Sequence, residues 1–447
     1  MREVAALRNA SIWSTDSTAA PQNEGPVTPP EIRTEVGPWL DRVGIPFDGP
    51  SPTRSSADLE PLRELIGDAR IVALGENTHG TRDFFQMKDR ILRFVVQEMG
   101  FDAFAIEATW PESNRLDTYV RTGEGDPTTL LSGLYFWTWN TASVLDMIHW
   151  MREHNEAGGD VGFYGFDMQF PGMALDNVVT YVAEVDPASA ATVTDQVRCL
   201  AAYSNDPGGR FPTSRYGDQP LTYRNACRSA LAEAQNNLLE HRAEYEAVSG
   251  TRAFELALQS LRVAIQYHES AADTQSRDES MAENVAWLAE FLGQDSRLVL
   301  WAHNYHVSTQ EGAMGQWLRL AFGDDMVVLG FTHAEGQFTA VTQSGSSFVG
   351  RDVHTLDPVR PLSYEHHLAS ASSPQFFLDL RVPVATSDST SWLPGPRNAR
   401  GIGCCFDPLA PSRYWSLQSL PALYDIIIHF DRTTATQVLP YQPPTVF

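Results

Sequence analysis

Residues 69–110 decide the fold, and they read ARIVALGENTHGTRDFFQMKDRILRFVVQEMGFDAFAIEATW. The uninterrupted apolar run 71–74 predicts a strand covered on both faces, as in a largely parallel sheet. Apolar residues then recur at helical spacing over 84–99, and Asp83 lies in the first turn, where an acid suits the helix dipole. A second apolar strand, 102–110, follows. The order of strand, turn, helix and strand is typical of an α/β fold.

Acidic and histidine residues lie where these elements meet. Glu76 and His79 share the turn after the first strand, and Glu107 lies near the end of the second. Neighbouring parallel strands end at one edge, where α/β sheets bind ligands, so we expect these three side chains to meet. The alternative is that Glu76 and His79 only satisfy amides of the turn. We expect Asn77 and Thr78 to cap the helix.

His79 would experience two opposed influences. The helix N-terminus favours its neutral form, whereas Glu76 or Glu107 favours its charged form. A histidine balanced in this way can titrate near neutral pH, where a general base works best.

The rest of the chain extends this pattern. Further strands are predicted at 161–166, 298–301, 326–331, 338–342, 376–380 and 426–430, and helices at 59–66, 113–120 and 142–153. Strand-like runs vanish over 174–293, where helical periodicity takes over. The predicted fold is therefore α/β, with a mixed, largely parallel sheet flanked by helices and an inserted helical subdomain beside the active-site cleft. The predicted organisation is a disordered tail (1–30), a first α/β part (31–173), the helical insertion (174–293) and a second α/β part (294–447).

Composition restricts the partners. The formal net charge of -24 argues against nucleic acid and anionic membranes, because a polyanion would be repelled, so a small-molecule substrate fits better. No apolar run approaches the roughly 18 to 20 residues of a membrane span, and the N-terminus shows no signal-peptide core. Cys199 and Cys227 are isolated and Cys404 and Cys405 adjacent, which indicates no disulfide framework and a cytoplasmic location.

Three segments leave alternatives open. The aromatic segment 135–139 is more typical of a core than of a ligand-stacking wall. The Gly/Pro-rich loop 206–212 could cover the cleft. His303 and His306 follow a predicted strand and could be metal ligands, a catalytic pair or polar turn residues. No HExxH or other zinc spacing accompanies them, so we expect no metal.

Several motifs occur in one order along the chain. They are Gly75-Glu-Asn-Thr-His-Gly80, Lys88-x-Arg90, Gly100-Phe101 to Ile106-Glu107, Tyr164-Gly-x-Asp167, Arg277-Asp278-x-x-Met-x-x-Asn284, Trp301-Ala-His-Asn-x-His306, Ser363-Tyr-Glu365-His-His367, Arg400-Gly-Ile-Gly403 and Leu420-Pro-x-x-Tyr-Asp425-Ile-Ile. Together they resemble the erythromycin esterase family over most of the chain from about residue 60.

The resemblance implies a hydrolase that opens macrolide lactone rings without a metal or other cofactor. By this resemblance His79 would be the base that activates water, with Glu76, Glu107 and His303 as catalytic companions. It also makes four residues candidates for substrate binding, namely Tyr164, Asp167, Arg277 and His306.

Lys88 departs from the family, whose members often carry arginine there. Lysine keeps the positive charge but lacks the bidentate fork of arginine. We expect Lys88 to help stabilise the oxyanion of the reaction.

Other chemistries remain open at this point. A serine nucleophile is disfavoured, because the sequence lacks Gly-x-Ser-x-Gly and residues 345–350 have the wrong spacing. Hydrolysis by an activated water is therefore the first prediction. A pathway enzyme catalysing elimination or cyclisation, or a binding protein without turnover, could use the same cleft.

Overall fold

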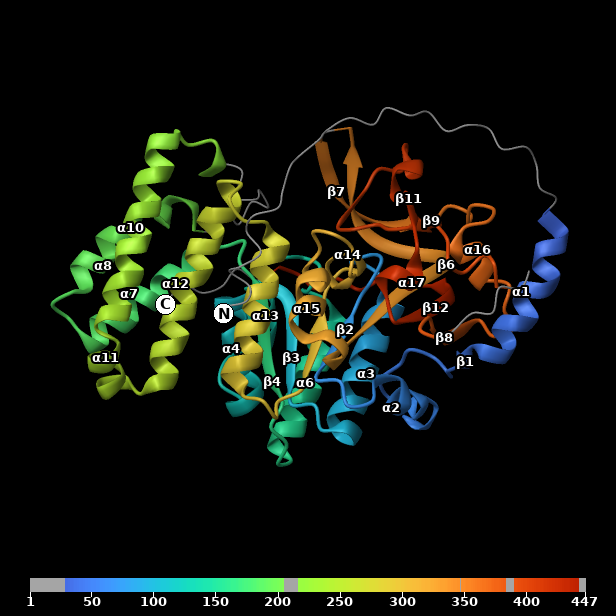
Figure 1. Cartoon of the computed structure of the whole chain (residues 1–447), viewed down its shortest axis with the longest axis horizontal. Coiled ribbons are helices and arrows are strands. Elements are labelled where there is room, and N and C mark those ends of the chain that lie inside the picture. The colour runs from blue at the N-terminus through green and yellow to red at the C-terminus, as the bar shows by residue number, and fades with distance from the viewer. Residues whose placement is uncertain (1–28, 205–215, 346, 383–389, 442–447) are drawn as a thin grey trace.

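The computed structural model describes residues 29–204, 216–345, 347–382 and 390–441. One part is built on a central sheet, and a group of helices lies against its side (Figure 1). The predicted α/β class, with a mixed and mostly parallel sheet flanked by helices, is confirmed.

The main sheet contains ten strands. Eight follow the order β1-β8-β12-β6-β2-β5-β3-β4, and β7 and β10 both pair with β6. Their bounds are β1 Ile45–Pro46, β2 Ile71–Leu74, β3 Ala103–Thr109, β4 Gly162–Asp167, β5 Leu298–Trp301, β6 Met326–Ser344, β7 Ser347–Thr355, β8 Gln375–Asp379, β10 Cys405–Phe406 and β12 Ile426–Thr433. The strands from β12 to β4 are parallel, whereas β8 runs antiparallel to β1 and β12. Strands β9 (Arg397–Arg400) and β11 (Trp415–Gln418) form a small separate sheet.

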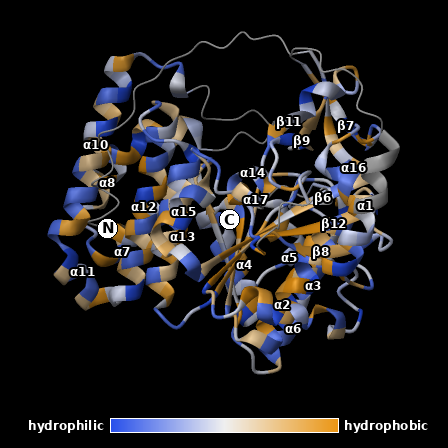
Figure 2. Ribbon diagram, turned by 45° about the vertical axis from the view of Figure 1, so that its right-hand side comes forward, coloured by the Kyte–Doolittle hydropathy of each residue, from blue (hydrophilic) through white to orange (hydrophobic). Residues whose placement is uncertain are grey.

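Strand β2 shows why the centre of the sheet is apolar throughout. Its alternating side chains enter two different cores, with Val72 and Leu74 on one face and Ile71 and Ala73 on the other. Because helices cover both faces, no position of β2 meets water. The apolar residues concentrate accordingly along the strands (Figure 2).

Helices from the first part of the chain cover one face of the sheet. They are α2 Pro61–Ile66, which follows the turn η2 Ala57–Leu59, α3 Arg82–Met99, α4 Trp110–Thr122, α5 Pro127–Ser132 and α6 Ala142–Glu156. The opposite face packs against α1 Pro29–Val43, α13 Arg277–Leu292, α14 Asn304–Val307, α15 Met314–Phe322, α16 Tyr364–Leu368 and α17 Leu420–Leu423. The short turns η4 Gly323–Asp325 and η5 Pro411–Tyr414 complete this half.

Between β4 and α13 the described chain is helical, as predicted for the insertion. It comprises α7 Gly172–Val185, α8 Ala190–Val197, η3 Arg198–Tyr203, α10 Leu221–Glu240, α11 Arg242–Ser249 and α12 Thr251–Ala271. These helices share an apolar core of their own, to which Leu231, Phe254 and Tyr267 belong. The loop 206–212 lies outside the described residues, as does the predicted tail up to residue 28.

One strand prediction is wrong. The segments 326–331 and 338–342 were expected to be separate strands, but both belong to the 19-residue strand β6. The polar residues between them stay extended because β12 continues its pairing as far as Thr433 opposite Gly336. Beyond that point β6 no longer pairs with β12 and pairs with β7 and β10 instead.

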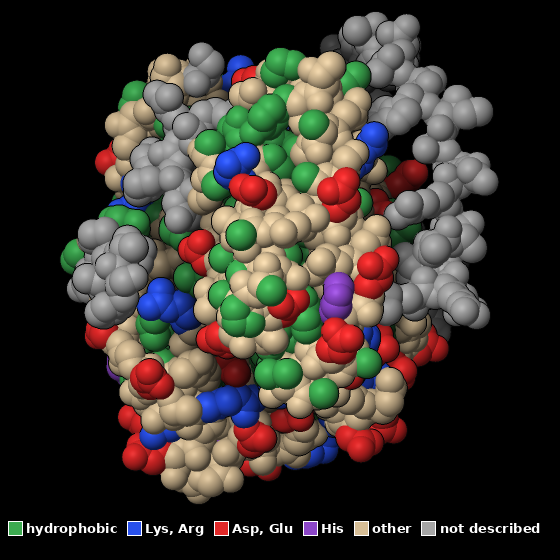
Figure 3. Space-filling model, turned by 90° about the vertical axis from the view of Figure 1, so that its left-hand side faces the viewer, with side chains coloured by type: hydrophobic (Ala, Val, Ile, Leu, Met, Phe, Trp, Pro, Cys, Tyr) green, Lys and Arg blue, Asp and Glu red, His purple; other side chains and the backbone are tan. Residues whose placement is uncertain are grey.

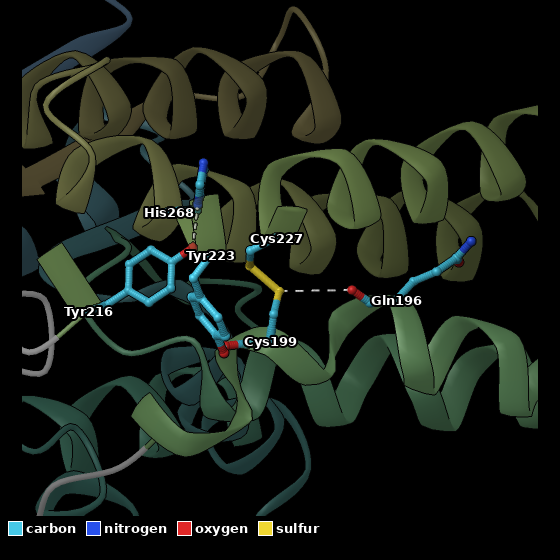
Figure 4. Close-up of a disulfide and its surroundings, with 6 residues drawn as sticks. All are labelled: Gln196, Cys199, Tyr216, Tyr223, Cys227 and His268. Carbon is cyan, nitrogen blue, oxygen red and sulfur yellow. Dashed lines mark hydrogen bonds between the residues drawn. A yellow bond between two sulfur atoms is a disulfide. The ribbon is translucent and has the colours of Figure 1, made fainter. Parts of the chain in front are cut away.

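The sequence indicated no disulfide framework, but the structure contains a disulfide. Cys199 of η3 and Cys227 of α10 form a disulfide across two neighbouring elements, with their Cα atoms 5.6 Å apart (Figure 4). The two cysteines are 28 residues apart, a spacing that matches no known disulfide motif. They meet only because the helices pack against each other, so the sequence alone did not reveal the pair. Cys404 and Cys405 are free. The cysteine pattern therefore no longer favours a reducing compartment.

Two further observations concern the exterior. No helix in the described ranges is long and apolar enough to cross a membrane. Acidic side chains are spread over the face of the molecule shown in Figure 3, in line with the net charge of -24. Such a face does not suit a polyanionic ligand.

Candidate active site

The turn after β2 is packed tightly against two other segments. A side-chain carbon added at Gly75 would collide with Asn304 at the start of α14, and one added at Gly80 would collide with the backbone of Thr339 in β6. Only glycine permits both approaches. The turn is therefore fixed between the segment after β5 and the outer half of β6.

The predicted helix caps are wrong. Thr81, not Asn77 or Thr78, is the N-cap position of α3, and it makes no side-chain capping bond. The side-chain amide of Asn77 instead donates a hydrogen bond to the Arg400 carbonyl oxygen at 3.2 Å. The hydroxyls of Thr78 and Thr81 form a hydrogen bond with each other. The local sequence could not reveal this, because the Asn77 partner lies 323 residues away.

Glu76 is fully buried and accepts three hydrogen bonds. One carboxylate oxygen, Oε1, accepts from His79 Nδ1 at 2.7 Å. The other, Oε2, accepts from Lys88 Nζ at 2.7 Å and from the indole nitrogen of Trp301 at 2.8 Å. The carboxylate is held on both sides, so it fixes the plane of the His79 ring.

His79 presents its second ring nitrogen to the site. Since Nδ1 donates to Glu76, the neutral ring carries its lone pair on Nε2, which makes no hydrogen bond within the described part of the chain. Burial favours the neutral form, but the hydrogen bond and negative charge of Glu76 outweigh it and raise the pKa of His79. The side chain is 12% exposed. This nitrogen is available to accept a proton.

Lys88 lies beneath Glu76. Its side chain is completely buried, with Nζ 3.4 Å from the Ala302 carbonyl oxygen and 4.5 Å from the centre of the Trp301 ring. Burial lowers the pKa of Lys88 to about 8, against the opposing charge of Glu76. Lys88 was predicted to stabilise an oxyanion; in the structure its buried Nζ binds Glu76 and the Ala302 carbonyl oxygen.

Glu107, at the end of β3, accepts two hydrogen bonds and lies beside His306. Its Oε1 lies 2.6 Å from Arg277 Nη2 and 3.3 Å from His306 Nε2, and its Oε2 accepts from the His303 amide at 2.9 Å. Burial favours the neutral acid, but His306 and Arg277 outweigh it and hold the pKa of Glu107 far below its usual range. Glu107 thus positions its neighbours and is a poor proton acceptor.

His303 differs sharply from His79, although their ring centres are only 5.1 Å apart. Burial and the proximity of His79 lower the pKa of His303 to about 3, so the ring is neutral. Its Nδ1 accepts from the Tyr305 amide at 3.2 Å, which places the proton on Nε2. That nitrogen is buried and makes no hydrogen bond of regular geometry in the described residues, although the Asn77 backbone lies close enough to act on the ring. The Nε2–H group of His303 can therefore donate a hydrogen bond to a ligand.

Arg277 and His306 connect the helical region to the sheet. Arg277, the first residue of α13, donates through Nε and Nη2 to both oxygens of Asp167 at 3.1 and 2.8 Å. Its Nη1 lies 3.1 Å from His306 Nε2, and His306 Nδ1 donates to Asp278 at 2.7 Å. Asp167, Arg277 and His306 were predicted to bind substrate, and in the structure their polar atoms lie together in one hydrogen-bonded group.

Tyr164 is not part of the group. It lies three residues before Asp167 on β4, in the apolar core on the sheet face that α13 covers. Its phenol oxygen accepts from Arg121 Nη2 at 3.1 Å. The structure thus brings eight of the nine predicted residues together and leaves Tyr164 apart.

Sequence reasoning missed two residues of the site and a third at its edge. Trp301 donates to Glu76, and Trp139 packs edge-on against the His79 ring at 5.8 Å while donating to the Glu107 carbonyl oxygen. A buried indole N–H needs a hydrogen-bond acceptor, and this could have indicated that the two tryptophans contact the acids of the site. Cys404 lies close enough for its charge to influence His79. Its only signal was its place directly after the Arg400-Gly-Ile-Gly403 motif.

The group lacks the arrangement of a metal centre. Among the residues that the structure describes, no three His, Cys, Asp or Glu side chains are grouped as metal ligands could be. The His306 ring nitrogens face Asp278 and the Arg277–Glu107 pair, and His79 Nδ1 faces Glu76. Both ring nitrogens of His306 and Nδ1 of His79 are therefore engaged within the chain, which leaves only Nε2 of His79 and of His303.

Comparison with known proteins relates this geometry to one family. The family model described as erythromycin esterase matches residues 96–433. The chain is 26% identical over 390 residues to YbfO of Bacillus subtilis (strain 168), which covers 81% of this chain and 84% of that protein. It is also 26% identical over 337 residues to erythromycin esterase type II of Escherichia coli, over 68% of this chain and 78% of that one.

A solved structure supports the fold. An erythromycin esterase mutant in its open conformation matches with a TM-score of 0.67 and 19% identity, over 88% of this chain and 98% of that one. The matched range 96–433 includes Glu107, Arg277 and His303 but begins after Glu76 and His79.

Proposed function

Because the chain belongs to the erythromycin esterase family, we propose that it is a hydrolase that cleaves an ester or lactone bond in a bulky small molecule. The nucleophile is a water molecule activated by His79. The observation that carries this proposal is the Glu76–His79 pair, because it holds one ring nitrogen and leaves the other free beside a neutral histidine.

Glu76 and His79 provide the base. Glu76 keeps the proton on Nδ1, so Nε2 takes a proton from water as the water oxygen attacks the carbonyl carbon. The positive charge that forms on the ring lies 2.7 Å from Glu76. The imidazolium then returns its proton to the departing alkoxide, which gives a carboxylic acid and an alcohol.

His303 provides the donor for the developing oxyanion. Its neutral ring carries the proton on Nε2, which makes no hydrogen bond of regular geometry in the described chain and has only the Asn77 backbone as a nearby competitor. A fixed donor of this kind stabilises a tetrahedral intermediate more than the planar ester. Glu107 holds the His303 amide in place, so it acts through the position of His303.

The substrate is a bulky, neutral or cationic lactone such as an amino-sugar macrolide. The Escherichia coli relative carries the name erythromycin esterase, and the net charge of -24 favours cations over anions. The Trp139 ring is almost completely buried, so it orients His79 by packing edge-on against it and offers no surface to the substrate.

The test is a panel of macrolactones and polyketide esters incubated with the purified protein in heavy-oxygen water. Hydrolysis adds one water and puts the heavy oxygen into the new carboxylate. Loss of water would instead indicate elimination, and an unchanged mass would indicate cyclisation or binding alone. If a compound of the panel binds but loses water or keeps its mass, the proposal is contradicted.

A second experiment uses a chelator to test whether the activity depends on a metal ion. If activity depends on the Glu76–His79 base alone, excess chelator leaves it undiminished. Loss of activity with chelator, restored by added zinc or manganese, would overturn the metal-independent mechanism.

A further inference from the structure

The segment 400–406 runs along the turn that carries Glu76 and His79. The Ile402 amide donates to the Asn77 carbonyl oxygen at 2.7 Å, and the Asn77 side chain donates back to Arg400. Two residues on, the Cys404 carbonyl oxygen accepts from the Val341 amide at 2.9 Å. These bonds fix Cys404 at the edge of the site.

This edge is open to small molecules. A side-chain carbon added at Gly401 or Gly403 would meet no atom within 4 Å, so the segment borders free space. Cys404 and Cys405 are free thiols, and both are partly exposed. The chain therefore presents a pair of adjacent thiols beside the base, and the proposed hydrolysis uses neither.

The surroundings of Cys404 favour its thiolate. The hydrogen bond from the Cys405 thiol outweighs burial, and the nearby positive charge of His79 adds to it, so the pKa of Cys404 falls below its ordinary value. The same interaction, with burial, raises the pKa of Cys405. The two sulfurs thus divide into a thiolate and a thiol donor.

Cys404 is not placed to replace water as the nucleophile. No hydrogen bond joins its sulfur to the His79 ring in the described structure, whereas Glu76 holds that ring directly. Because Cys404 still acts on the charge of His79, a change at its sulfur would be felt at the base.

We propose that Cys404 is a redox modification site at the edge of the active site, where hydroperoxides oxidise its sulfur and block the approach to His79. The Cys404 thiolate attacks one oxygen of the hydroperoxide and the O–O bond breaks. The departing hydroxide or alkoxide takes a proton from solvent or from protonated His79. The sulfur becomes a sulfenic acid as the peroxide is reduced to water or alcohol. An added thiol reverses the change.

The first experiment reads the modification itself and needs no substrate. The full chain is treated with hydrogen peroxide and a cyclic 1,3-diketone that traps sulfenic acids, and its peptides are weighed. We expect the adduct on Cys404, formed at pH 6.5 roughly tenfold faster than on a free cysteine peptide, whose thiol is about 1% ionised there. Equal labelling of Cys404 and Cys405, or a rate no faster than the peptide, overturns the proposal.

Matched variants test the cause of the reactivity. Cys405→Ser keeps a donor to the Cys404 sulfur and should preserve the fast reaction, whereas Cys405→Ala removes it and should slow labelling several-fold at pH 6.5. His79→Asn should also slow it by removing the positive charge. If all three variants label at the same rate, the surroundings do not activate Cys404.

The loss of activity rests on the proposed hydrolysis. Peroxide should inactivate the unmodified protein reversibly and leave Cys404→Ser unaffected. If untreated Cys404→Ser has no hydrolytic activity, the thiol is itself part of the chemistry and the proposal is wrong. Should no ester be hydrolysed at all, the labelling result still decides whether the thiol is reactive.

Discussion

Glu76 orients the base His79 because its two carboxylate oxygens bind different partners. Oε1 holds His79, while Oε2 is held by Lys88 and Trp301. A carboxylate secured on one side cannot rotate away from the ring on the other. This gives the fully buried lysine in the middle of the site a role that acts through Glu76.

His79→Asn tests the base directly. Asparagine can still form hydrogen bonds in the turn, but it cannot accept the proton of water. Turnover should fall on the order of 10²- to 10⁴-fold, or roughly 3 to 5 kcal/mol of barrier. Substrate affinity, measured by equilibrium binding, should change far less. A variant with full turnover would show that another group activates the water.

The pH dependence of catalysis tests the role of Glu76. Glu76 raises the pKa of His79 above 6.5, and only neutral His79 accepts a proton. The value of kcat/KM should therefore rise with pH through a pKa above 6.5. In Glu76→Gln the rising limb should move to lower pH, and the plateau should fall because the ring loses its orientation. If the rising limb of kcat/KM stays at the same pH in Glu76→Gln, Glu76 does not control the pKa of the catalytic base.

Glu112 offers a prediction about stability. Burial raises the pKa of Glu112 to about 8, although Arg115 and a hydrogen bond with Tyr135 oppose the shift. The unfolded chain releases this proton near pH 4.5 and the folded chain near pH 8, so the folded state binds more protons between these values. This contribution to stability therefore falls as pH rises from 4.5 to 8, by about 1.4 kcal/mol for each step of one in pH.

Glu112→Gln cannot ionise and should lose less stability across this pH range than the parent protein. Urea denaturation between pH 5 and pH 8.5 would show it, with the exposed Glu124→Gln as control. Parallel curves for Glu112→Gln and the parent would mean that Glu112 is ionised in the folded state.

At the scale of elements, the start of α13 joins the helical region to the sheet. Ser276 caps the helix by accepting from the Glu279 amide at 3.0 Å. This cap aims Arg277 at Glu107 and Asp167, the acids at the ends of β3 and β4. The helix thus completes a site whose base lies on the turn after β2.

Arg277→Lys should weaken this junction. Lysine keeps the charge but cannot contact Glu107, Asp167 and His306 at once. We expect kcat/KM to fall roughly 10- to 100-fold, about 1.4 to 3 kcal/mol, mostly in kcat because His303 loses its position. Arg262→Lys is the control, since Arg262 pairs with Glu269 and Glu283 within the helical region. Equal losses in both variants would indicate a general effect on stability.

Elements with strong apolar runs were predictable, and long-range pairings were not. Strands β2 and β3 and the acids at their ends followed from the sequence, because parallel strands share an edge. The course of β6 depends on β12, almost 100 residues later, so its polar middle misled the prediction. Tyr164 was misplaced because three residues along a strand span about 10 Å and reverse the face, so proximity to Asp167 in sequence did not bring it into the site.

At the scale of the whole molecule, the chain has separate apolar cores. Two lie on the faces of the sheet, and a third lies among α7, α8, α10, α11 and α12. The Cys199–Cys227 disulfide belongs to this third core alone. Separate cores allow one region to open before another.

The disulfide can be verified first by thiol titration of the denatured, unreduced protein. Two of the four cysteines should react, namely Cys404 and Cys405. Four reactive thiols would mean that Cys199 and Cys227 remain reduced, and replacing them would then remove no cross-link.

Replacing both Cys199 and Cys227 by serine should loosen the helical region selectively. A bond between residues 28 apart constrains the unfolded chain by about 3 to 4 kcal/mol on the basis of chain entropy. Because the bond lies within one core, hydrogen exchange should accelerate in α10 and α12 while β2 and β5 keep their protection. Cys405→Ser, which removes a thiol outside this core, is the control. Equal loss of protection in the strands would show that the cores unfold together, and the helical region would then not be a separate unit.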